Sequence, residues 1–275
     1  MEMTGAQILV EWMLREGVEK LFGYAGATIC PLADVLRNTP QLDYTLVRNE
    51  QNAAHMASGY ARISGKTGVC IVTSGPGATN LLTGIATAYM DSIPLVAFTG
   101  QVPSHLLGRD IFQEVDITGA ASAFSKHSYL VKDAAELPRI ISESFHIAST
   151  GRPGPVLIDV PIDVQEQVVF DPVFPEEVNI RGYHPSVRGN DKQITHVVNA
   201  IATAQRPVIC AGGGVFLSNA LLELETFAAR TRIPVVTTMM GVSLLPTDHP
   251  LNMGMIGTHG NACANKALAK SDLLI

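Results

Sequence analysis

Short apolar runs alternate with stretches of helical spacing over the first 160 residues of the chain. Thr4 and Gln7 have the spacing of a capping box, and the apolar residues that follow them share one helical face. Apolar runs predict strands at residues 20–24, 44–47, 69–73, 95–99, 127–131 and 156–160. Helices are expected between them, at residues 31–37, 50–64, 78–88 and 133–149. This order predicts an α/β fold with a doubly wound parallel six-stranded sheet, because such apolar strands need cover on both faces.

The pattern changes after residue 167. Residues 168–191 contain three prolines and two glycines with little periodicity, which is typical of an interdomain linker. A second α/β unit is predicted over residues 192–275, with strands at 207–210 and 235–238 and a strand-like tail at 272–275. Since a buried strand needs neighbours on both sides, we expect this Rossmann-like domain to be incomplete. The expected domains are therefore 1–167 and 192–275, joined by the linker.

Composition narrows the class of protein. Only 16% of the 275 residues are charged and 47% are apolar, which indicates large buried surfaces or subunit contacts. With 19 Lys and Arg against 25 Asp and Glu, a nucleic-acid partner is not expected. A membrane span is not expected either, because no apolar run approaches the roughly 18 residues required. Charged residues also interrupt the first apolar stretch, which argues against a signal peptide.

The four cysteines, Cys30, Cys70, Cys210 and Cys263, are far apart and form no CxxC pair. Metal sites use closely spaced ligands, so no metal site is predicted within the chain. We expect reduced and mostly buried thiols in a cytoplasmic protein.

Three polar segments follow predicted strands, where ligands bind in doubly wound sheets. Residues 48–51 (Arg-Asn-Glu-Gln) begin a helix, and from spacing alone capping of that helix is their better explanation. Residues 73–80 form a Gly-rich turn that either approaches a ligand or is simply tight, and it lacks the Lys of a P-loop. Residues 108–114, followed by Lys126-His127, suit either an active-site loop or a solvated one.

Two small-residue segments stand out in the second unit. Residues 212–214 are three glycines after a strand, and residues 253–260 are rich in glycine. Both patterns allow a flat ligand or a dinucleotide near the backbone. Plain packing and a flexible loop explain them about as well.

Taken in order, these segments resemble one family, the thiamine diphosphate-dependent large subunit of acetohydroxyacid (acetolactate) synthase. The matching segments are 48–51, 59–62, 73–80, 86–94, 100–102, 112–114, 126–127, 151–155 and 253–260. The resemblance covers essentially the whole chain. It implies that the first domain binds the pyrimidine of thiamine diphosphate and that the second is part of the central domain.

The resemblance also implies a reaction, the decarboxylation of pyruvate and the transfer of the two-carbon unit to a second 2-oxo acid, as in branched-chain amino acid biosynthesis. In the family, a glutamate matching Glu50 hydrogen-bonds a ring nitrogen of the aminopyrimidine and stabilises its imino tautomer. Gln113 and Lys126, with Phe112, match positions near the reacting carbons. The expected pyrimidine pocket consists of Gly26, Gly75, Pro76, Gly77 and Asn80.

The family's central domain commonly holds FAD in a structural role. The positions that match its FAD contacts are Arg152, Gly212, Gly213, Met255, His259 and Gly260. A third domain of the family holds the diphosphate through Mg²⁺ and a GDG…N motif, and this sequence has no such motif. The expected assembly is a homodimer or homotetramer, with a small regulatory subunit left open. We therefore expect these residues alone to be inactive.

The chain departs from the family pattern at Ala25, Asn49, Ser104, His105 and Ile162. These departures concern substrate choice more than reaction type, because Glu50 and the Gly-rich turn are present. Two alternatives stay open: another thiamine diphosphate-dependent 2-oxo acid decarboxylase or carboligase, and a non-catalytic binding or scaffold module.

Overall fold

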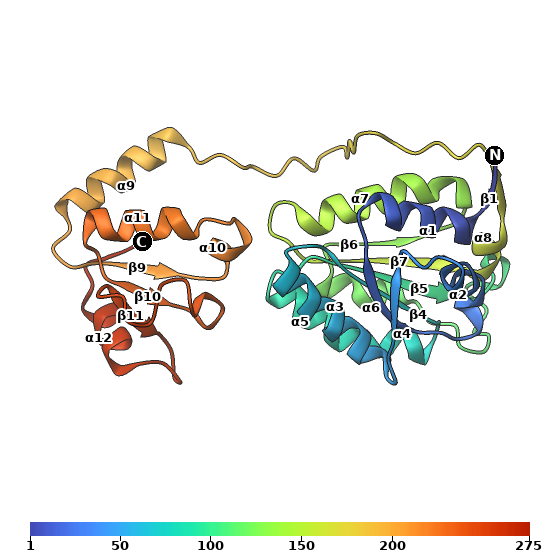
Figure 1. Ribbon diagram of the computed structural model, residues 1–275, viewed down its shortest axis with the longest axis horizontal. Coiled ribbons are helices and arrows are strands. Elements are labelled where there is room, and N and C mark those ends of the chain that lie inside the picture. Colours follow the sequence, from blue (N-terminus) through green and yellow to red (C-terminus); the bar gives the residue numbers. More distant parts are fainter. The chain divides into compact units, whose positions relative to one another are not determined.

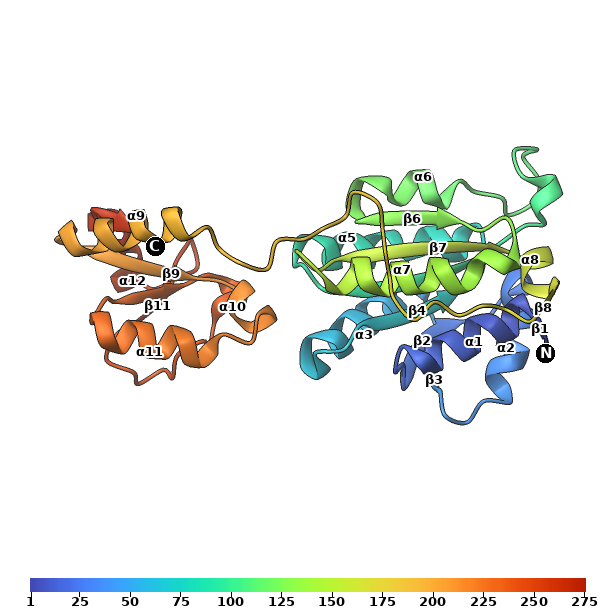
Figure 2. The same cartoon turned by 90° about the horizontal axis from the view of Figure 1, so that it is seen from above.

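A parallel sheet with the strand order β3-β2-β4-β5-β7-β6 is the centre of the first of two compact units. The computed structural model describes residues 1–275 and divides them into Met1–Pro185 and Ser186–Ile275 (Figure 1). Figure 2 shows β3 and β6 at the two edges of this sheet. The doubly wound parallel sheet predicted from the apolar runs is confirmed.

The strands of the first unit are β1 (Glu2–Thr4), β2 (Lys20–Tyr24), β3 (Asp43–Leu46), β4 (Gly68–Val72), β5 (Leu95–Gln101), β6 (His127–Leu130), β7 (Pro155–Pro161) and β8 (Val168–Phe170). Its α-helices are α1 (Gly5–Arg15), α2 (Cys30–Arg37), α3 (Glu50–Ser64), α4 (Pro76–Asn80), α5 (Leu82–Met90), α6 (Ile117–Ala121), α7 (Leu137–Ser149) and α8 (Ile162–Glu166). The helix expected at 78–88 is two helices, and Pro76 begins the first one because its fixed φ suits a first helical position.

Alternate residues of each central strand supply two separate cores. Val69 and Ile71 of β4 pack with α1, α2 and α7, whereas Cys70 and Val72 pack with α3, α4, α5 and α6. Figure 1 shows α1 and α7 on one face of the sheet and α3 and α5 on the other. Because both faces are covered, the strands contain continuous apolar runs instead of alternating ones.

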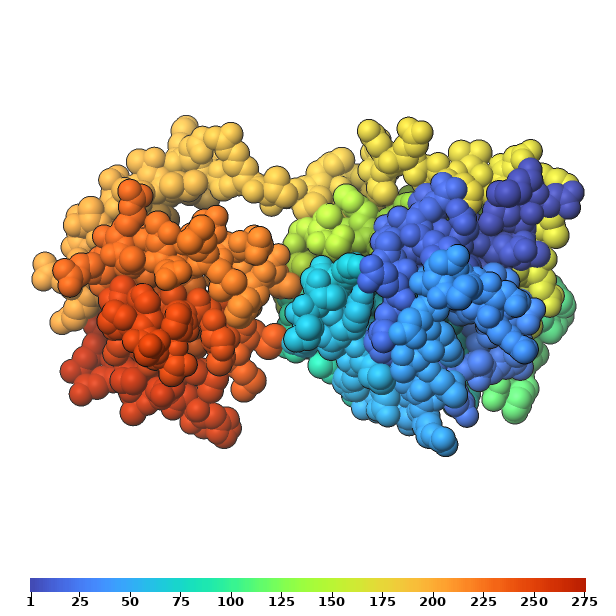
Figure 3. Space-filling model, in the orientation of Figure 1, coloured from blue at the N-terminus to red at the C-terminus, as the bar shows by residue number.

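The segment that follows β8 packs on the first unit. β8 pairs with β1 in an antiparallel ladder, and Phe174 stacks on Trp12 with ring centroids 5.0 Å apart. Ile180 and Tyr183 pack against the same core as Trp12. Figure 3 shows this yellow segment lying on the surface of the unit. The division between the compact units, after Pro185, therefore falls inside the segment expected as a linker.

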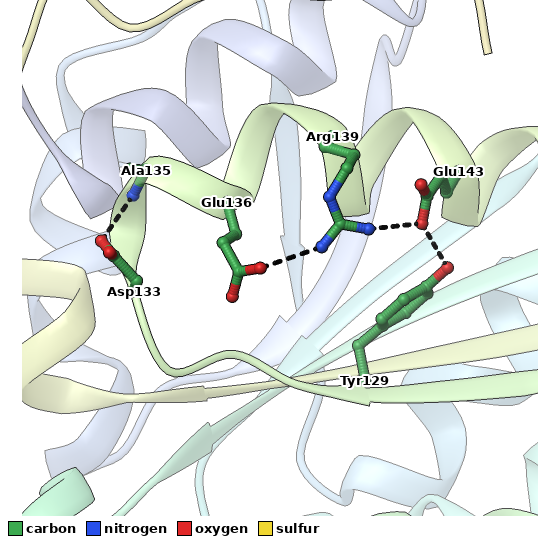
Figure 4. A network of polar contacts seen from close by, with 6 residues as sticks. All are labelled: Tyr129, Asp133, Ala135, Glu136, Arg139 and Glu143. Atoms are coloured by element: carbon green, nitrogen blue, oxygen red, sulfur yellow. Dashed lines mark hydrogen bonds and ion pairs between the residues drawn. The ribbon is translucent and has the colours of Figure 1, made fainter. Parts of the chain in front are cut away.

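A chain of ion pairs and hydrogen bonds covers the outer face of α7. Arg139 contacts Glu136 at 3.1 Å and Glu143 at 2.9 Å, and Glu143 accepts a hydrogen bond of 2.8 Å from the hydroxyl of Tyr129 on β6 (Figure 4). Asp133 accepts a hydrogen bond from the backbone N–H of Ala135 just before the helix. Burial, followed by the Glu143 carboxylate, raises the pKa of Tyr129. These contacts connect α7 to the edge strand β6.

The second unit contains α9 (Asp191–Thr203), β9 (Pro207–Ala211), α10 (Gly214–Leu217), α11 (Leu221–Thr231), β10 (Val235–Thr237), β11 (Asn252–Met255), α12 (Ala262–Lys270) and β12 (Leu273–Leu274). Its parallel sheet has the order β11-β10-β9-β12. Residues of α9 and α11 pack on one face, and Ala264 and Ala267 of α12 pack on the other. This confirms a second α/β unit with a parallel sheet.

The second unit differs from the sequence prediction at two places. The tail that was expected to be a strand is β12, which pairs with β9, but β11 lies where no strand was expected. The strand β11 contains Gly254, which has φ +89°, and for this reason its sequence does not predict a strand. The pairing of β11 with β10 contains a register shift. The sequence predicts one helix here, from Ser218 to about Arg232. The helix α11 corresponds to it, and the short helix α10 before it is not predicted.

All four cysteines are free, but the expectation that they are mostly buried is wrong. Cys70 is buried within β4, and burial raises its pKa to about 12. Cys30 and Cys263 are exposed because they lie in helices on the outside of each unit. No helix of the structure combines the length and the apolar character that crossing a membrane requires.

One carboxylate lies inside the first sheet. Asp159 of β7 is 1% exposed, and it accepts hydrogen bonds from the hydroxyl of Thr99 at 2.6 Å and from Nε2 of Gln101 at 2.9 Å. Burial raises the pKa of Asp159 to about 7, and the charge of Asp116 adds to the increase, against the two hydrogen bonds. The cost of burying the ionised form is only partly offset by these neutral donors.

Asp159→Asn should remove a pH dependence of folding stability. A carboxyl with pKa near 3.9 when unfolded and about 7 when folded stabilises the native state below pH 4, and this contribution is lost as pH rises through 7. The shift corresponds to about 4 kcal/mol. Urea unfolding at several pH values between 4 and 8 should show the unaltered protein losing this stability relative to the variant. Parallel curves for the two proteins would contradict the prediction.

Candidate functional site

The carboxyl edge of the first sheet opens between β2 and β4. From β2 the chain turns to β3 on one side, and β4 lies on the other side. Connections that leave in opposite directions create a crevice at the carboxyl ends of the strands, which is where open α/β sheets bind ligands. The loop after β2 and the turn after β4 form the two sides of this crevice.

Glu50 is the first residue of α3, and its side chain reaches the turn after β4. Asn49 caps the helix by accepting a hydrogen bond of 2.9 Å from the N–H of Gln51. Glu50 does not share this capping contact. Its Oε2 accepts a hydrogen bond of 2.8 Å from Nδ2 of Asn80, thirty residues further along. The half-buried carboxylate is thus held across the crevice entrance, which helix capping alone does not explain.

The Gly-rich turn lies directly under this carboxylate. A Cβ on Gly77 would lie 2.7 Å from Cγ2 of Thr73 and 3.3 Å from Oε1 of Glu50. Pro76 begins α4, and Gly75 before it has φ +58° and ψ −123°, a conformation that favours glycine. Because Gly75 and Gly77 have no side chains, the turn brings only its backbone to the site.

Two threonines join the loops on either side of the crevice. The hydroxyls of Thr28 and Thr73 lie 3.0 Å apart, and Oγ1 of Thr28 also accepts a hydrogen bond of 3.0 Å from the N–H of Ser74. A Cβ on Gly26 would lie 2.6 Å from the side chain of Thr73. Thr28 was not predicted from the sequence, although a hydroxyl residue in the turn that follows a strand was a signal for it.

Gln113 reaches the same turn from a third segment, the loop between β5 and α6. A Cβ on Gly75 would lie 2.8 Å from the carbonyl oxygen of Gln113, so the two backbones are in close contact. Gln113 itself has φ +60°. The side chain of Phe112 beside it is 87% exposed. The structure therefore brings together Gly26, Glu50, Gly75, Pro76, Gly77, Asn80 and Gln113.

Lys126 lies at the opposite edge of the sheet, immediately before the start of β6. Its Nζ donates hydrogen bonds to the carbonyls of Ile147 and Thr150 at the end of α7 and to the hydroxyl of Tyr183. The amino ends of parallel strands are separated from the carboxyl ends by the length of the strands. Within this chain, the structure does not bring Lys126 to Glu50.

Ser104, one of the positions that depart from the family pattern, holds Asp163. The Ser104 hydroxyl donates to Asp163 at 2.5 Å, and the Ser104 N–H donates at 2.9 Å. Burial would raise the pKa of Asp163, but these hydrogen bonds outweigh it and lower that pKa. Gln165 of the same helix α8 donates a hydrogen bond of 2.8 Å to the carbonyl of Thr28. Ser104 therefore supports a helix that touches the crevice loop.

The residues expected to contact FAD are distributed over both units. Arg152 belongs to the first unit, where its Nε donates a hydrogen bond of 2.7 Å to Ser92. The others lie at the carboxyl edge of the second sheet. Gly212 and Gly213 follow β9, and a Cβ on Gly213 would lie 3.0 Å from Cβ of Met240.

The turn after β11 is equally tight. Met255 ends β11, and Asn261 bonds back to it with its backbone N–H at 2.7 Å. A Cβ on Gly260 would lie 2.6 Å from the carbonyl carbon of Ile256, while His259 beside it is exposed. The two Gly-rich turns thus share one sheet edge.

Comparison with known families agrees with this architecture. Residues 3–120 match the family described as "Thiamine pyrophosphate enzyme, N-terminal TPP binding domain". Residues 194–275 match "Thiamine pyrophosphate enzyme, central domain". The chain therefore belongs to the thiamine pyrophosphate enzymes, thiamine pyrophosphate being another name for thiamine diphosphate.

Within that class, the chain is similar to acetolactate synthases. It is 48% identical over 99% of its length to the acetolactate synthase of Arthrospira platensis, covering 48% of that protein. It is 49% identical over 99% of its length to a probable acetolactate synthase large subunit of Methanococcus aeolicus, covering 46%. The large subunit of Corynebacterium glutamicum is 47% identical over 99% of this chain, which covers 44% of it. The chain spans about half the length of these curated relatives.

Gly75→Ala should disturb the site, and Gly65→Ala is its matched control. Both glycines have positive φ. Gly65 lies in the left-handed helical region, where Ala costs about 1–2 kcal/mol, and Gly75, with ψ −123°, costs at least as much. A Cβ at Gly65 meets nothing within 4 Å, whereas at Gly75 it meets the backbone of Gln113. We expect Gly75→Ala to destabilise the protein more than the control and to weaken thiamine diphosphate binding. Urea unfolding and calorimetric titration check this, and equal effects of the two variants would contradict it.

Proposed function

We propose that the polypeptide carrying this chain is a thiamine diphosphate-dependent enzyme of the acetolactate synthase type. It decarboxylates pyruvate and transfers the two-carbon unit to a second 2-oxo acid. The observation that carries the proposal is the position of Glu50, whose carboxylate is held by Asn80 over the Gly77 turn. The names of the relatives, acetolactate synthases with 47–49% identity, support the same reaction.

The crevice fits the aminopyrimidine of the cofactor. Oε2 of Glu50 is used by Asn80, whereas Oε1 accepts no hydrogen bond from this chain and lies beside Gly77. Any side chain at Gly77 would occupy the space between Thr73 and that oxygen. A flat ring with a protonated nitrogen suits this arrangement, because it needs both an acceptor and room against a bare backbone.

The bound cofactor supplies an electron sink for the carbon from which carbon dioxide leaves. Oε1 of Glu50 would hold the proton that this residue exchanges with the bound cofactor. Asn80 fixes the rotation of the carboxylate through Oε2, so that Oε1 stays directed into the crevice. Gly26, Gly75 and Pro76 provide the backbone walls of the pocket. Gln113 lies against the Gly75 turn, and it and the exposed Phe112 beside it would contact the substrate.

Lys126 receives a different role in this proposal. Its Nζ donates hydrogen bonds to carbonyls at the end of α7 and to Tyr183, so its role within the chain is structural. We propose that the second unit binds FAD at the edge formed by Gly212, Gly213, Met255, His259 and Gly260. Mg²⁺ and the diphosphate would be held by residues outside this chain, in a homodimer or homotetramer that works with or without a small regulatory subunit.

Glu50→Gln tests the catalytic role. The amide has the same size and still offers Asn80 an acceptor, but it cannot exchange a proton with the cofactor. We expect the rate of pyruvate consumption in the complete enzyme to fall roughly 100-fold or more, with little change in unfolding. Glu136→Gln, at the exposed residue just before α7, is the matched control. An unchanged rate in Glu50→Gln would overturn the catalytic role of Glu50.

Product analysis tests the substrate class. Supplied with pyruvate alone, the complete enzyme should form acetolactate. Supplied with pyruvate and 2-oxobutyrate, it should form acetohydroxybutyrate as well. Decarboxylation without either product would instead indicate another 2-oxo acid decarboxylase or carboligase.

A further inference from the structure

The loop that carries Gln113 is tied to the sheet by a buried side chain, that of Gln101. Gln101 is the last residue of β5 and is 2% exposed. Its Nε2 donates a hydrogen bond of 2.9 Å to the carbonyl oxygen of Val115, two residues after Gln113. This contact connects the central sheet directly to the loop.

Every polar group of the Gln101 side chain is used. Nε2 also donates to Oδ2 of Asp159 at 2.9 Å, and Oε1 accepts a hydrogen bond of 2.9 Å from the N–H of Val102. With the amide turned over, Oε1 would face two acceptors, Oδ2 of Asp159 and the Val115 carbonyl. The amide is therefore locked in one orientation, because a buried acceptor facing an acceptor is costly.

Asp159 is held in turn by Thr99, whose hydroxyl donates to Oδ1 at 2.6 Å. Thr99, Gln101 and Asp159 are all buried, and they lie on the adjacent strands β5 and β7. The network therefore belongs to the rigid sheet, and the Val115 carbonyl is where it reaches the loop.

The internal shape of the loop has a separate origin. The Glu114 carboxylate accepts hydrogen bonds from the N–H groups of Gly108, Arg109 and Ile111. These backbone donors, that of Gly108 first, lower the pKa of Glu114 despite a smaller opposing effect of burial. Glu114 therefore shapes the loop, while Gln101 determines where the shaped loop sits on the sheet.

We propose that Gln101, oriented by Asp159, is a positioning residue that holds the Gln113 loop against the Gly75 turn. This rests on the proposed function, since Gln113 acts there beside the cofactor pocket. Loss of the Val115 contact leaves the loop intact but free to move away from Gly75. Substrate binding should then suffer more than cofactor binding, because Glu50, Asn80 and Gly77 belong to other segments.

Gln101→Met in the complete enzyme tests the proposal, since methionine has a similar shape and no amide. Two quantities are measured: amide hydrogen exchange of residues 107–116, and KM for pyruvate separately from kcat. We expect amide exchange in the loop to become roughly tenfold faster and KM for pyruvate to rise roughly tenfold. A tenfold change corresponds to the free energy of about one hydrogen bond. Thiamine diphosphate affinity should change little.

Thr99→Val is the matched control, because it removes a buried hydrogen bond of the same network without touching Val115. It should lower stability yet leave loop exchange and KM unchanged. Asp159→Ala is a second variant, since it removes the acceptor that orients the Gln101 amide but leaves the amide able to reach Val115. It should loosen the loop less than Gln101→Met does.

The proposal would be overturned if amide hydrogen exchange of the loop were the same in Gln101→Met and Asp159→Ala as in the unaltered enzyme. It would also be overturned by an equal loosening in Thr99→Val, because that would indicate a general loss of stability. Failure of the proposed function is distinguishable from both outcomes. In that case the unaltered enzyme would not consume pyruvate, while loop exchange would still report whether Gln101 holds the loop.

Discussion

Parallel pairing of β2 with β3 on one side and β4 on the other is the constraint on which the site depends. It sends the chain in opposite directions from neighbouring strands, so that the loops after β2 and β4 separate at the carboxyl edge. Two threonines then join these loops from below, through the contact of 3.0 Å between Thr28 and Thr73. A crevice with a polar floor and backbone walls is the result. Glu50 needs no special conformation to reach it, because its helix begins at that edge.

Polar side chains inside the first unit do more than satisfy one another. Gln101 and Asp159 occupy positions in the sheet where apolar residues would pack at lower cost. The free-energy cost of burying these polar groups is explained by the hydrogen bond to the Val115 carbonyl, because this bond connects the network to the loop beside the site. Lys126 serves a similar purpose at the other edge, where it joins the end of α7 to Tyr183 of the segment after β8. Structural polar contacts thus organise both edges of the sheet.

Much of the fold was predictable because both periodicities are local. The six strands of the first sheet and the tail strand of the second unit could be read from apolar runs, and the Thr4 capping box from two residues. β1, β8 and β11 could not. The first two are three residues long and form only by pairing with each other across most of the unit, and β11 contains a glycine at positive φ. Exposure of Cys30 and Cys263 was equally hidden, since it depends on which side of a helix faces the unit.

The sequence by itself determined the class of fold and the segments that could meet a cofactor. Periodicity and turn residues act over a few positions, and that range is enough to order strands and helices along the chain. The tertiary structure alone decided which candidates meet. It joined Glu50 to Asn80 and placed Gln113 on Gly75, but it placed Lys126 at the far edge of the same sheet. The physical reason is that these contacts join residues tens of positions apart, and only strand order and direction determine which loop ends share an edge.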